Sequence, residues 1–284
     1  MNELLLERIF DKVENIPPFP ETAQKALTIL RKEEVDFREL ERVVKSDPGI
    51  AANFLKLVNS PAFMLPQKVD SLFKAFMYLG VNQIKFILLA SVAGVYFNKD
   101  LKGYGISAQD IWIHSLACGV LGEILGNLLN LSYEKIESLY IGCLLHDIGK
   151  IVLNLYTTIE KEKFQEVIKK EPTWDFNQVE WLVLGVDHGL VGGYLFKKWG
   201  FPEEISTAIR AHHDPDLMLQ SRLSALVALS NILANMIGFE GGVDCFYYKV
   251  PENLIDYLGL DFKDWTEPLR EAYKKVFYLH RSLF

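Results

Sequence analysis

The stretch LLHDIGKIVL, residues 144–153, sets a histidine, an aspartate and a lysine among residues of the kind that fill protein cores. Burying an unpaired charge is costly, because the charged group loses its hydration without gaining a partner. A buried His146, Asp147 and Lys150 therefore require either charged partners in the protein or a bound charged species. The rest of the chain decides between these explanations and indicates the fold around them.

Composition narrows the class of protein. The 284 residues are 50% hydrophobic and 24% charged, which suits one large or two ordinary globular domains. The formal charge is -7 and no basic block stands out, so broad nucleic-acid binding is not expected. The longest apolar run, residues 86–97, is shorter than the ~20 residues that span a bilayer, and the acidic, amphipathic start does not resemble a secretory signal. We expect a cytoplasmic protein with no membrane partner and make no prediction of its oligomeric state.

Helical periodicity runs through nearly the whole chain without a convincing alternating strand, which predicts an all-α fold. Prolines 17, 18 and 20 should end a first helix, and Asp47 before Pro48 should open a later one. Up to residue 97, helices are expected over 4–13, 21–31, 36–45, 48–58, 71–79 and 82–97. The polar stretch 98–107 is the best boundary, giving an N-terminal helical bundle (1–100) packed on a helical domain with the site (101–240), followed by a helical extension (241–284).

The histidines are unevenly distributed. Five of the six lie between Asp110 and Asp214, in helical patterns and mostly near acidic residues. One histidine on an apolar helix face is usually a hydrogen-bonded core residue, but five together favour a functional site. The five are His114, His146, His188, His212 and His213. By contrast, the widely spaced Cys118, Cys143 and Cys245 lie in apolar patterns and are predicted to be reduced core thiols.

Helix geometry adds a test of this interpretation. Residues four apart differ by about 40° in direction and share a face, as Asp110 with His114 and His146 with Lys150 would. Neighbours such as His212 and His213 diverge by about 100° and reach two adjacent positions more easily than one. Two metal ions about 3.5 to 4 Å apart need such a ligand set. Imidazole and carboxylate ligands suit iron, manganese or zinc, and a set without cysteine gives no reason to expect soft-metal selectivity.

Two groups of motifs resemble known families. His114, the HDIGK segment, His188 and the His212–His213 pair are similar to the HD superfamily of metal-dependent phosphohydrolases, in the branch that includes the HD-GYP phosphodiesterases. In the first half, IPPFPETAQKAL (16–27), SDPGIAANFLKLVNSPAF (46–63) and YLG (78–80) resemble the HDOD domain, a bacterial signalling module related to HD-GYP. The resemblance covers roughly residues 10 to 240 and implies a regulatory protein built on an HD-type domain.

The resemblance also implies roles for particular residues. Asp147 and Lys150 would be catalytic, with Lys150 meeting phosphate as a compact positive charge. Asn231 stands where the superfamily has an aspartate, and a neutral amide is a weaker ligand, so one ion should bind loosely or be lost. The segment HHDPDLML (212–219) lacks the GYP sequence, which argues against hydrolysis of cyclic di-GMP. The implied metal ligands are Asp110, His114, His146, Asp147, His188, His212, His213 and Asn231.

Two classes of function agree with this sequence. The first is a signalling protein whose HD-type site binds one or two divalent ions, of iron, manganese or zinc, and hydrolyses a phosphate ester. A phosphorylated nucleotide signal or other signalling proteins are its expected partners. The second is a non-catalytic interaction scaffold, in which the histidines and carboxylates satisfy one another and no metal chemistry occurs.

Overall fold

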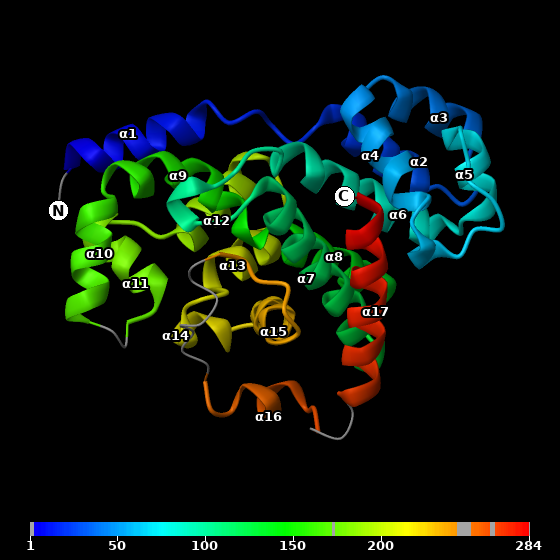
Figure 1. The fold of residues 1–284 in the computed structure, drawn as a ribbon. Coiled ribbons are helices and arrows are strands. Elements are labelled where there is room, and N and C mark those ends of the chain that lie inside the picture. The colour runs from blue at the N-terminus through cyan, green and yellow to red at the C-terminus, as the bar shows by residue number, and fades with distance from the viewer. Residues whose placement is uncertain (1–2, 172–173, 243–250, 262–264, 284) are drawn as a thin grey trace.

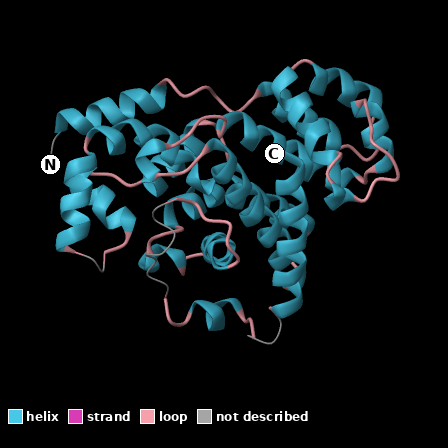
Figure 2. Cartoon of the chain, in the orientation of Figure 1, coloured by secondary structure: helices cyan, strands magenta, loops and turns pink. Residues whose placement is uncertain are grey.

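The computed structural model describes residues 3–171, 174–242, 251–261 and 265–283 (Figure 1). Over these ranges the chain is helical and has no strand, only a single bridge between Leu101 and Ile106 (Figure 2). The all-α prediction is confirmed. The first elements are α1 (Glu3–Glu14), α2 (Glu21–Leu30), α3 (Phe37–Lys45), α4 (Pro48–Val58), η1 (Pro61–Phe63), α5 (Leu72–Tyr78) and α6 (Val81–Tyr96).

The remaining elements carry or enclose the histidines. Figure 1 shows them in the middle and lower part of the molecule, with the last helix crossing them on one side. They are η2 (Lys102–Tyr104), α7 (Ala108–Leu128), α8 (Tyr133–Leu145), η3 (His146–Ile148), α9 (Gly149–Ile159), α10 (Lys161–Lys170), α11 (Phe176–Leu184), α12 (His188–Lys198), α13 (Glu203–Ala211), α14 (Pro215–Met218), α15 (Arg222–Met236), α16 (Leu254–Leu258) and α17 (Thr266–Leu283).

The helix starts follow the local signals that the sequence contains. Asp36 caps α3 by accepting hydrogen bonds from two backbone N–H groups, and Asp47 caps α4 with Pro48 in its first turn. Helix α6 is buried on nearly all sides, because it lies between α2 and α4 on one side and α7 and α8 on the other. The apolar core therefore continues from the α2–α6 bundle into the second half of the chain.

Helix α1 does not join that bundle, contrary to the expectation for residues 1–100. It lies at the opposite end of the molecule against α9, where the Tyr156 hydroxyl donates to the Arg8 carbonyl at 2.8 Å (Figure 1). Lys198 of α12 also donates to the Glu14 carbonyl at 2.7 Å. The physical reason is the proline cluster at 17, 18 and 20, which cannot continue a helix and keeps the connection to α2 extended.

Helix α7 is the central element of the second half. By length and composition alone it could cross a bilayer, but 78% of its apolar window is buried inside the fold. It packs against α8, α15 and α17 and carries His114, which is fully buried. We therefore interpret α7 as a core helix that holds one wall of the histidine site.

Helix α17 connects the two halves. The Ser60 hydroxyl donates to the Tyr278 carbonyl at 3.0 Å, and Lys275 forms a 3.0 Å ion pair with Glu123 of α7. The expected boundary at 98–107 packs against the rest of the protein, because Tyr104 within it is fully buried.

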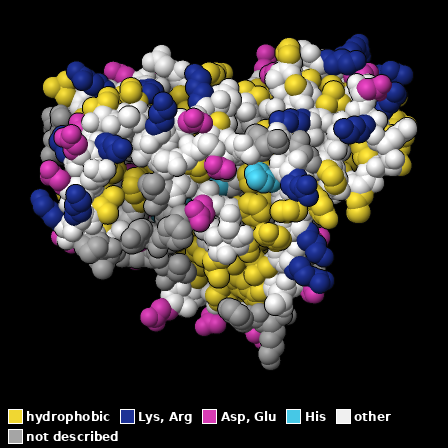
Figure 3. Space-filling view, in the orientation of Figure 1, with side chains coloured by type: hydrophobic (Ala, Val, Ile, Leu, Met, Phe, Trp, Pro, Cys, Tyr) yellow, Lys and Arg dark blue, Asp and Glu magenta, His cyan; other side chains and the backbone are white. Residues whose placement is uncertain are grey.

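On the face drawn in Figure 3, basic and acidic side chains are interspersed.

Candidate metal centre

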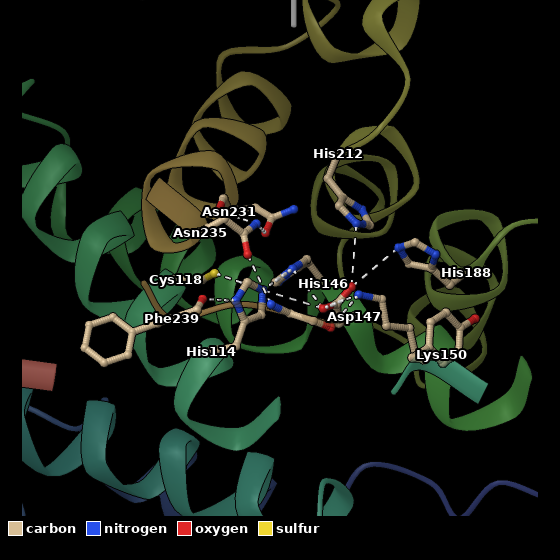
Figure 4. A network of polar contacts seen from close by, with 12 residues as sticks. His114, Cys118, His146, Asp147, Lys150, His188, His212, Asn231, Asn235 and Phe239 are labelled. Atoms are coloured by element: carbon tan, nitrogen blue, oxygen red, sulfur yellow. Dashed lines mark hydrogen bonds and ion pairs between the residues drawn. The ribbon is translucent and has the colours of Figure 1, made fainter. Parts of the chain in front are cut away.

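The structure brings His114, His146, Asp147, Lys150, His188, His212 and His213 together in one buried cluster (Figure 4). The side chains of this cluster are between 0 and 6% exposed. The ring centroids of His146 and His212 are 4.9 Å apart, and those of His188 and His213 are 4.8 Å apart. Residues separated by up to 99 positions thus meet where η3 and the ends of three helices converge.

Asp147 lies between two groups of imidazoles. Its Oδ1 is 3.5 Å from His188 Nε2 and 3.9 Å from His212 Nε2. Its Oδ2 is 3.4 Å from His146 Nε2 and 3.6 Å from His114 Nε2. One carboxylate therefore faces two positions, which is the arrangement that a bridging ligand between two ions requires.

Hydrogen bonds fix how three of these rings present their nitrogens. In each ring Nδ1 lies within hydrogen-bond distance of a backbone carbonyl, which can only accept, so Nδ1 carries the proton of the neutral ring. The Nε2 lone pair then points into the cluster, as it does in metal-binding histidines. The pairs are His114 with Phe239 at 2.7 Å, His146 with Cys143 at 2.8 Å and His212 with Ile209 at 2.5 Å.

Burial controls the charge of the cluster. It lowers the pKa of His146 to about 4, and it holds the pKa of His212 and His213 well below the usual range, helped by the neighbouring imidazoles. These rings are therefore neutral near pH 7, which is the form that binds metal ions. Burial alone would raise the pKa of Asp147, but the neighbouring basic groups, Lys150 and His188 among them, outweigh burial and keep the carboxylate ionised.

Glu180 of α11 sets the orientation of His188. Its Oε2 accepts from His188 Nδ1 at 2.8 Å and from the His188 backbone N–H at 3.0 Å, and its Oε1 accepts from the Tyr104 hydroxyl. Burial disfavours the charged ring, yet the Glu180 carboxylate outweighs burial and raises the pKa of His188 to about 9. A histidine held by a carboxylate in this way is a more basic ligand through its other nitrogen.

Three buried atoms of the cluster have no hydrogen-bond partner among the described residues: Asp147 Oδ1, His188 Nε2 and His212 Nε2. Ligand atoms of Asp147, His188, His212 and His213 all lie within 4.8 Å of one another. Unsatisfied buried polar atoms are rare in folded proteins, and several that converge on one point are typical of a ligand-binding site. Nitrogen and carboxylate donors at these separations fit a divalent iron, manganese or zinc ion.

Lys150 closes the Oδ2 side of Asp147. Its Nζ donates to Asp147 Oδ2 at 2.9 Å and to the Gly241 carbonyl at 3.1 Å. Gly241 lies against His114, where a Cβ atom would be 2.9 Å from Nε2. Position 149, within the HDIGK segment, also requires a glycine, because a Cβ atom there would overlap the His188 carbonyl.

Two predicted metal ligands, Asp110 and Asn231, are hydrogen-bonded to other residues of the protein. The structure does not bring Asp110 into the cluster: its side chain is exposed in the first turn of α7, and the Ser107 hydroxyl donates to it at 2.6 Å. The N-cap residue Ser107 holds this carboxylate at the start of α7. The four-residue spacing from His114 therefore does not bring Asp110 into the cluster. Asn231 is buried on α15, and its side-chain oxygen accepts from Asn235 Nδ2 at 3.0 Å. Asn235 in turn accepts from the Gly241 N–H at 3.1 Å, so Asn231 supports the segment that covers the cluster.

The sequence interpretation missed two residues of the site. Glu180 has no local signal, because it precedes His188 by eight residues and belongs to a different helix. Cys118 does have a local signal, because it lies four residues after His114 on α7. Its Sγ is 3.6 Å from His114 Nε2. Cys118 and Cys143 are buried free thiols, and Cys245 lies outside the described residues.

Comparison with known proteins assigns the family. The family model of the HDOD domain matches residues 16–215, so the chain belongs to the HDOD family. An uncharacterised protein of Treponema pallidum (strain Nichols) is 22% identical over 257 residues, which cover 89% of this chain and 48% of that protein. The chain thus spans about half the length of this relative.

Solved structures share the fold. An HDOD domain protein of unknown function from Geobacter sulfurreducens has a TM-score of 0.75 and 19% identity, over 99% of this chain and 97% of that one. A protein from Shewanella amazonensis SB2B, named as a candidate metal-dependent phosphohydrolase, has a TM-score of 0.63 and 15% identity, over 99% and 98% of the two chains. At these identities the likeness concerns the fold alone.

Proposed function

We propose that this HDOD protein is a metal-dependent phosphohydrolase that acts in signalling, with its ions held around Asp147. The observation that carries the proposal is the convergence of Asp147 Oδ1, His188 Nε2 and His212 Nε2, buried and without partners among the described residues. A scaffold whose groups satisfied one another would have no reason to leave these three atoms unpaired.

In this proposal the histidines and Asp147 bind the ions, and Lys150 neutralises charge on the substrate. His188, His212 and His213 with Asp147 Oδ1 would hold one ion, and His114 and His146 with Asp147 Oδ2 would hold a second. Ions held in this way supply hydroxide from water near neutral pH and neutralise phosphoryl oxygens. Lys150, already 2.9 Å from Asp147, adds a fixed positive charge for a substrate phosphate. We propose a phosphorylated nucleotide signal as the substrate class.

The test is metal content together with phosphodiester hydrolysis, on protein purified without chelator or histidine tag. We expect iron, manganese or zinc in the wild type, and slow hydrolysis of a chromogenic bis-aryl phosphate that added metal increases. Asn231→Asp should raise both metal occupancy and rate, because it restores a carboxylate where the superfamily has one. If wild type and Asn231→Asp both contain none of the three metals, the scaffold function replaces the hydrolase.

One observation favours the scaffold function as a second candidate. The cluster is enclosed, with Phe239 bonded to His114 and Gly241 bonded to Lys150, so a substrate has no open route to Asp147 through this segment. A protein that binds its ions fully but hydrolyses no phosphate ester, at any metal concentration, would be a metal-stabilised scaffold.

A further inference from the structure

Cys118 presents its sulfur to the Oδ2 side of the cluster. Its Sγ is 3.6 Å from His114 Nε2, which is itself 3.3 Å from His146 Nε2, and ligand atoms of the three residues all lie within 4.8 Å of one another. Figure 4 shows the sulfur next to His114, on the side of the cluster away from His188. All three residues are fully buried.

We propose that Cys118, His114 and His146 form a thiolate-containing site for the second ion, and that this site prefers zinc. The inference rests on the proposed function, since it concerns one of the two ions held around Asp147. It changes the expectation from the sequence, in which the ligand set contained no cysteine. A thiolate is a soft, anionic ligand and favours zinc over manganese.

The distances match a tetrahedral ion. With bonds of about 2.05 Å to nitrogen and about 2.3 Å to sulfur, two nitrogens around zinc lie about 3.3 Å apart, and a nitrogen and a sulfur about 3.6 Å apart. The structure has 3.3 Å between the two Nε2 atoms and 3.6 Å between His114 Nε2 and Cys118 Sγ. Asp147 Oδ2 lies 3.4 and 3.6 Å from the same nitrogens, so a carboxylate stands beside these ligands.

The protonation of the two rings supports an ion rather than a hydrogen bond between them. His114 and His146 each place Nδ1 against a backbone carbonyl, so in the neutral rings both Nε2 atoms carry lone pairs. Both lone pairs, 3.3 Å apart, are then directed so that one positive ion can accept them.

Cys118 also accounts for the charge that Asn231 does not provide. At the superfamily position the amide of Asn231 is neutral, and its oxygen already accepts from Asn235. A thiolate from α7 supplies a negative ligand to the same half of the site. The second ion would therefore have a negative ligand in the wild type, and Asn231→Asp would add another.

Cobalt spectroscopy tests the proposal, because a thiolate bound to Co²⁺ gives a sulfur-to-metal charge-transfer band in the near ultraviolet. The protein is stripped of metal and titrated with Co²⁺, in a Cys245→Ser background that leaves only the two described thiols. Cys118→Ser is the test variant. Cys143→Ser is the matched control, since Cys143 is also a buried thiol but has its sulfur packed beside Gly122 of α7.

We expect the band in the parent and in Cys143→Ser, and its loss in Cys118→Ser together with one of two bound ions. Cobalt that binds to the parent without the band overturns the thiolate site and leaves the proposed function standing. A parent that binds none of cobalt, zinc, iron and manganese overturns both. If Cys118→Ser does not fold, judged by circular dichroism, Cys118→Ala is measured in its place.

Discussion

Two buried groups of charged residues lie in this molecule, and they differ in how completely they are satisfied. In the first, Glu137 of α8 accepts from Lys85 of α6 at 3.4 Å and from Arg31, which directly follows α2. The side chains of Lys85 and Glu137 are both 7% exposed, so this pair joins the α2–α6 bundle to the second half of the chain inside the protein. In the second group, around Asp147, three buried ligand atoms have no hydrogen-bond partner among the described residues.

The difference separates a structural ion network from a binding site. Both groups are buried and charged, so burial and charge alone do not distinguish them. Both carboxylate oxygens of Glu137 are occupied by cations of the protein, whereas Oδ1 of Asp147 has no hydrogen bond from the described residues and lies 3.5 Å from His188 Nε2. Removing a member of the first group should therefore alter stability, and removing a member of the second should alter metal binding.

The largest effect is expected from Asp147→Ala. Asp147 contacts both groups of imidazoles, so its loss should reduce the content of both ions to background and abolish any phosphodiester hydrolysis. Plasma mass spectrometry of the purified variant measures the first effect. A variant that retains two ions per chain would show that Asp147 does not bridge them. The group around Asp147 could then no longer be distinguished from the Glu137 group as a metal-binding site.

Glu137→Ala tests the other group. It leaves Lys85 buried without its carboxylate, and breaking a buried pair in this way costs about 3 to 5 kcal/mol of unfolding free energy. Urea denaturation measures the loss, and the metal content of the folded variant should be unchanged. The control is Glu21→Ala, which removes an ion pair with Lys25 whose side chains are 61% and 77% exposed, and should leave the denaturation midpoint unchanged.

A smaller effect is expected from Glu180→Gln, which sharpens the comparison inside the metal site. The amide keeps a hydrogen-bond acceptor near His188 but removes the charge, and loss of such an orienting partner weakens metal affinity by about 10- to 100-fold. Competition with a chelating dye measures the affinity. Glu123→Gln, which loses the ion pair to Lys275 on another face of α7, should bind metal as the wild type does.

The smallest effect is expected from Asp110→Ala. The exposed carboxylate accepts from Ser107 at the start of α7, so its loss should cost about 0.5 kcal/mol of helix stability and leave metal affinity unchanged. The same dye competition and urea denaturation apply. A tenfold weaker affinity in this variant would return Asp110 to the ligand set.

The fold was predictable where the signals are local. Asp36 and Asp47 cap the helices they precede, and the proline cluster stops α1, because each acts on its own neighbours in the chain. The packing of α1 on α9 was not predictable, since it depends on contacts such as that of Tyr156 with Arg8, which are 148 residues apart. Local patterns determine where helices begin and end but not which helices meet.

The site shows the same division. The unusual density of histidines and the HDIGK segment indicated the cluster, and the spacing of His146 and Lys150 placed both against Asp147. The four-residue spacing from His114 predicted Asp110 as a ligand, but the cap residue Ser107 binds its carboxylate. Cys118 was predicted to be a core thiol, and it lies both in the core and beside the cluster. Glu180 reaches His188 only through the packing of α11 on α12, which no pattern within either helix reveals.

The segment from Phe239 to Gly241 also has a kinetic consequence. Its backbone is bonded to His114, Lys150 and Asn235. If a bound ion leaves past this segment, these bonds break first, and the rate at which a chelator removes metal should reach a ceiling as chelator concentration rises. That ceiling is the opening rate of the segment. A protein with this cover would keep its ions through brief metal starvation, independently of how tightly it binds them at equilibrium.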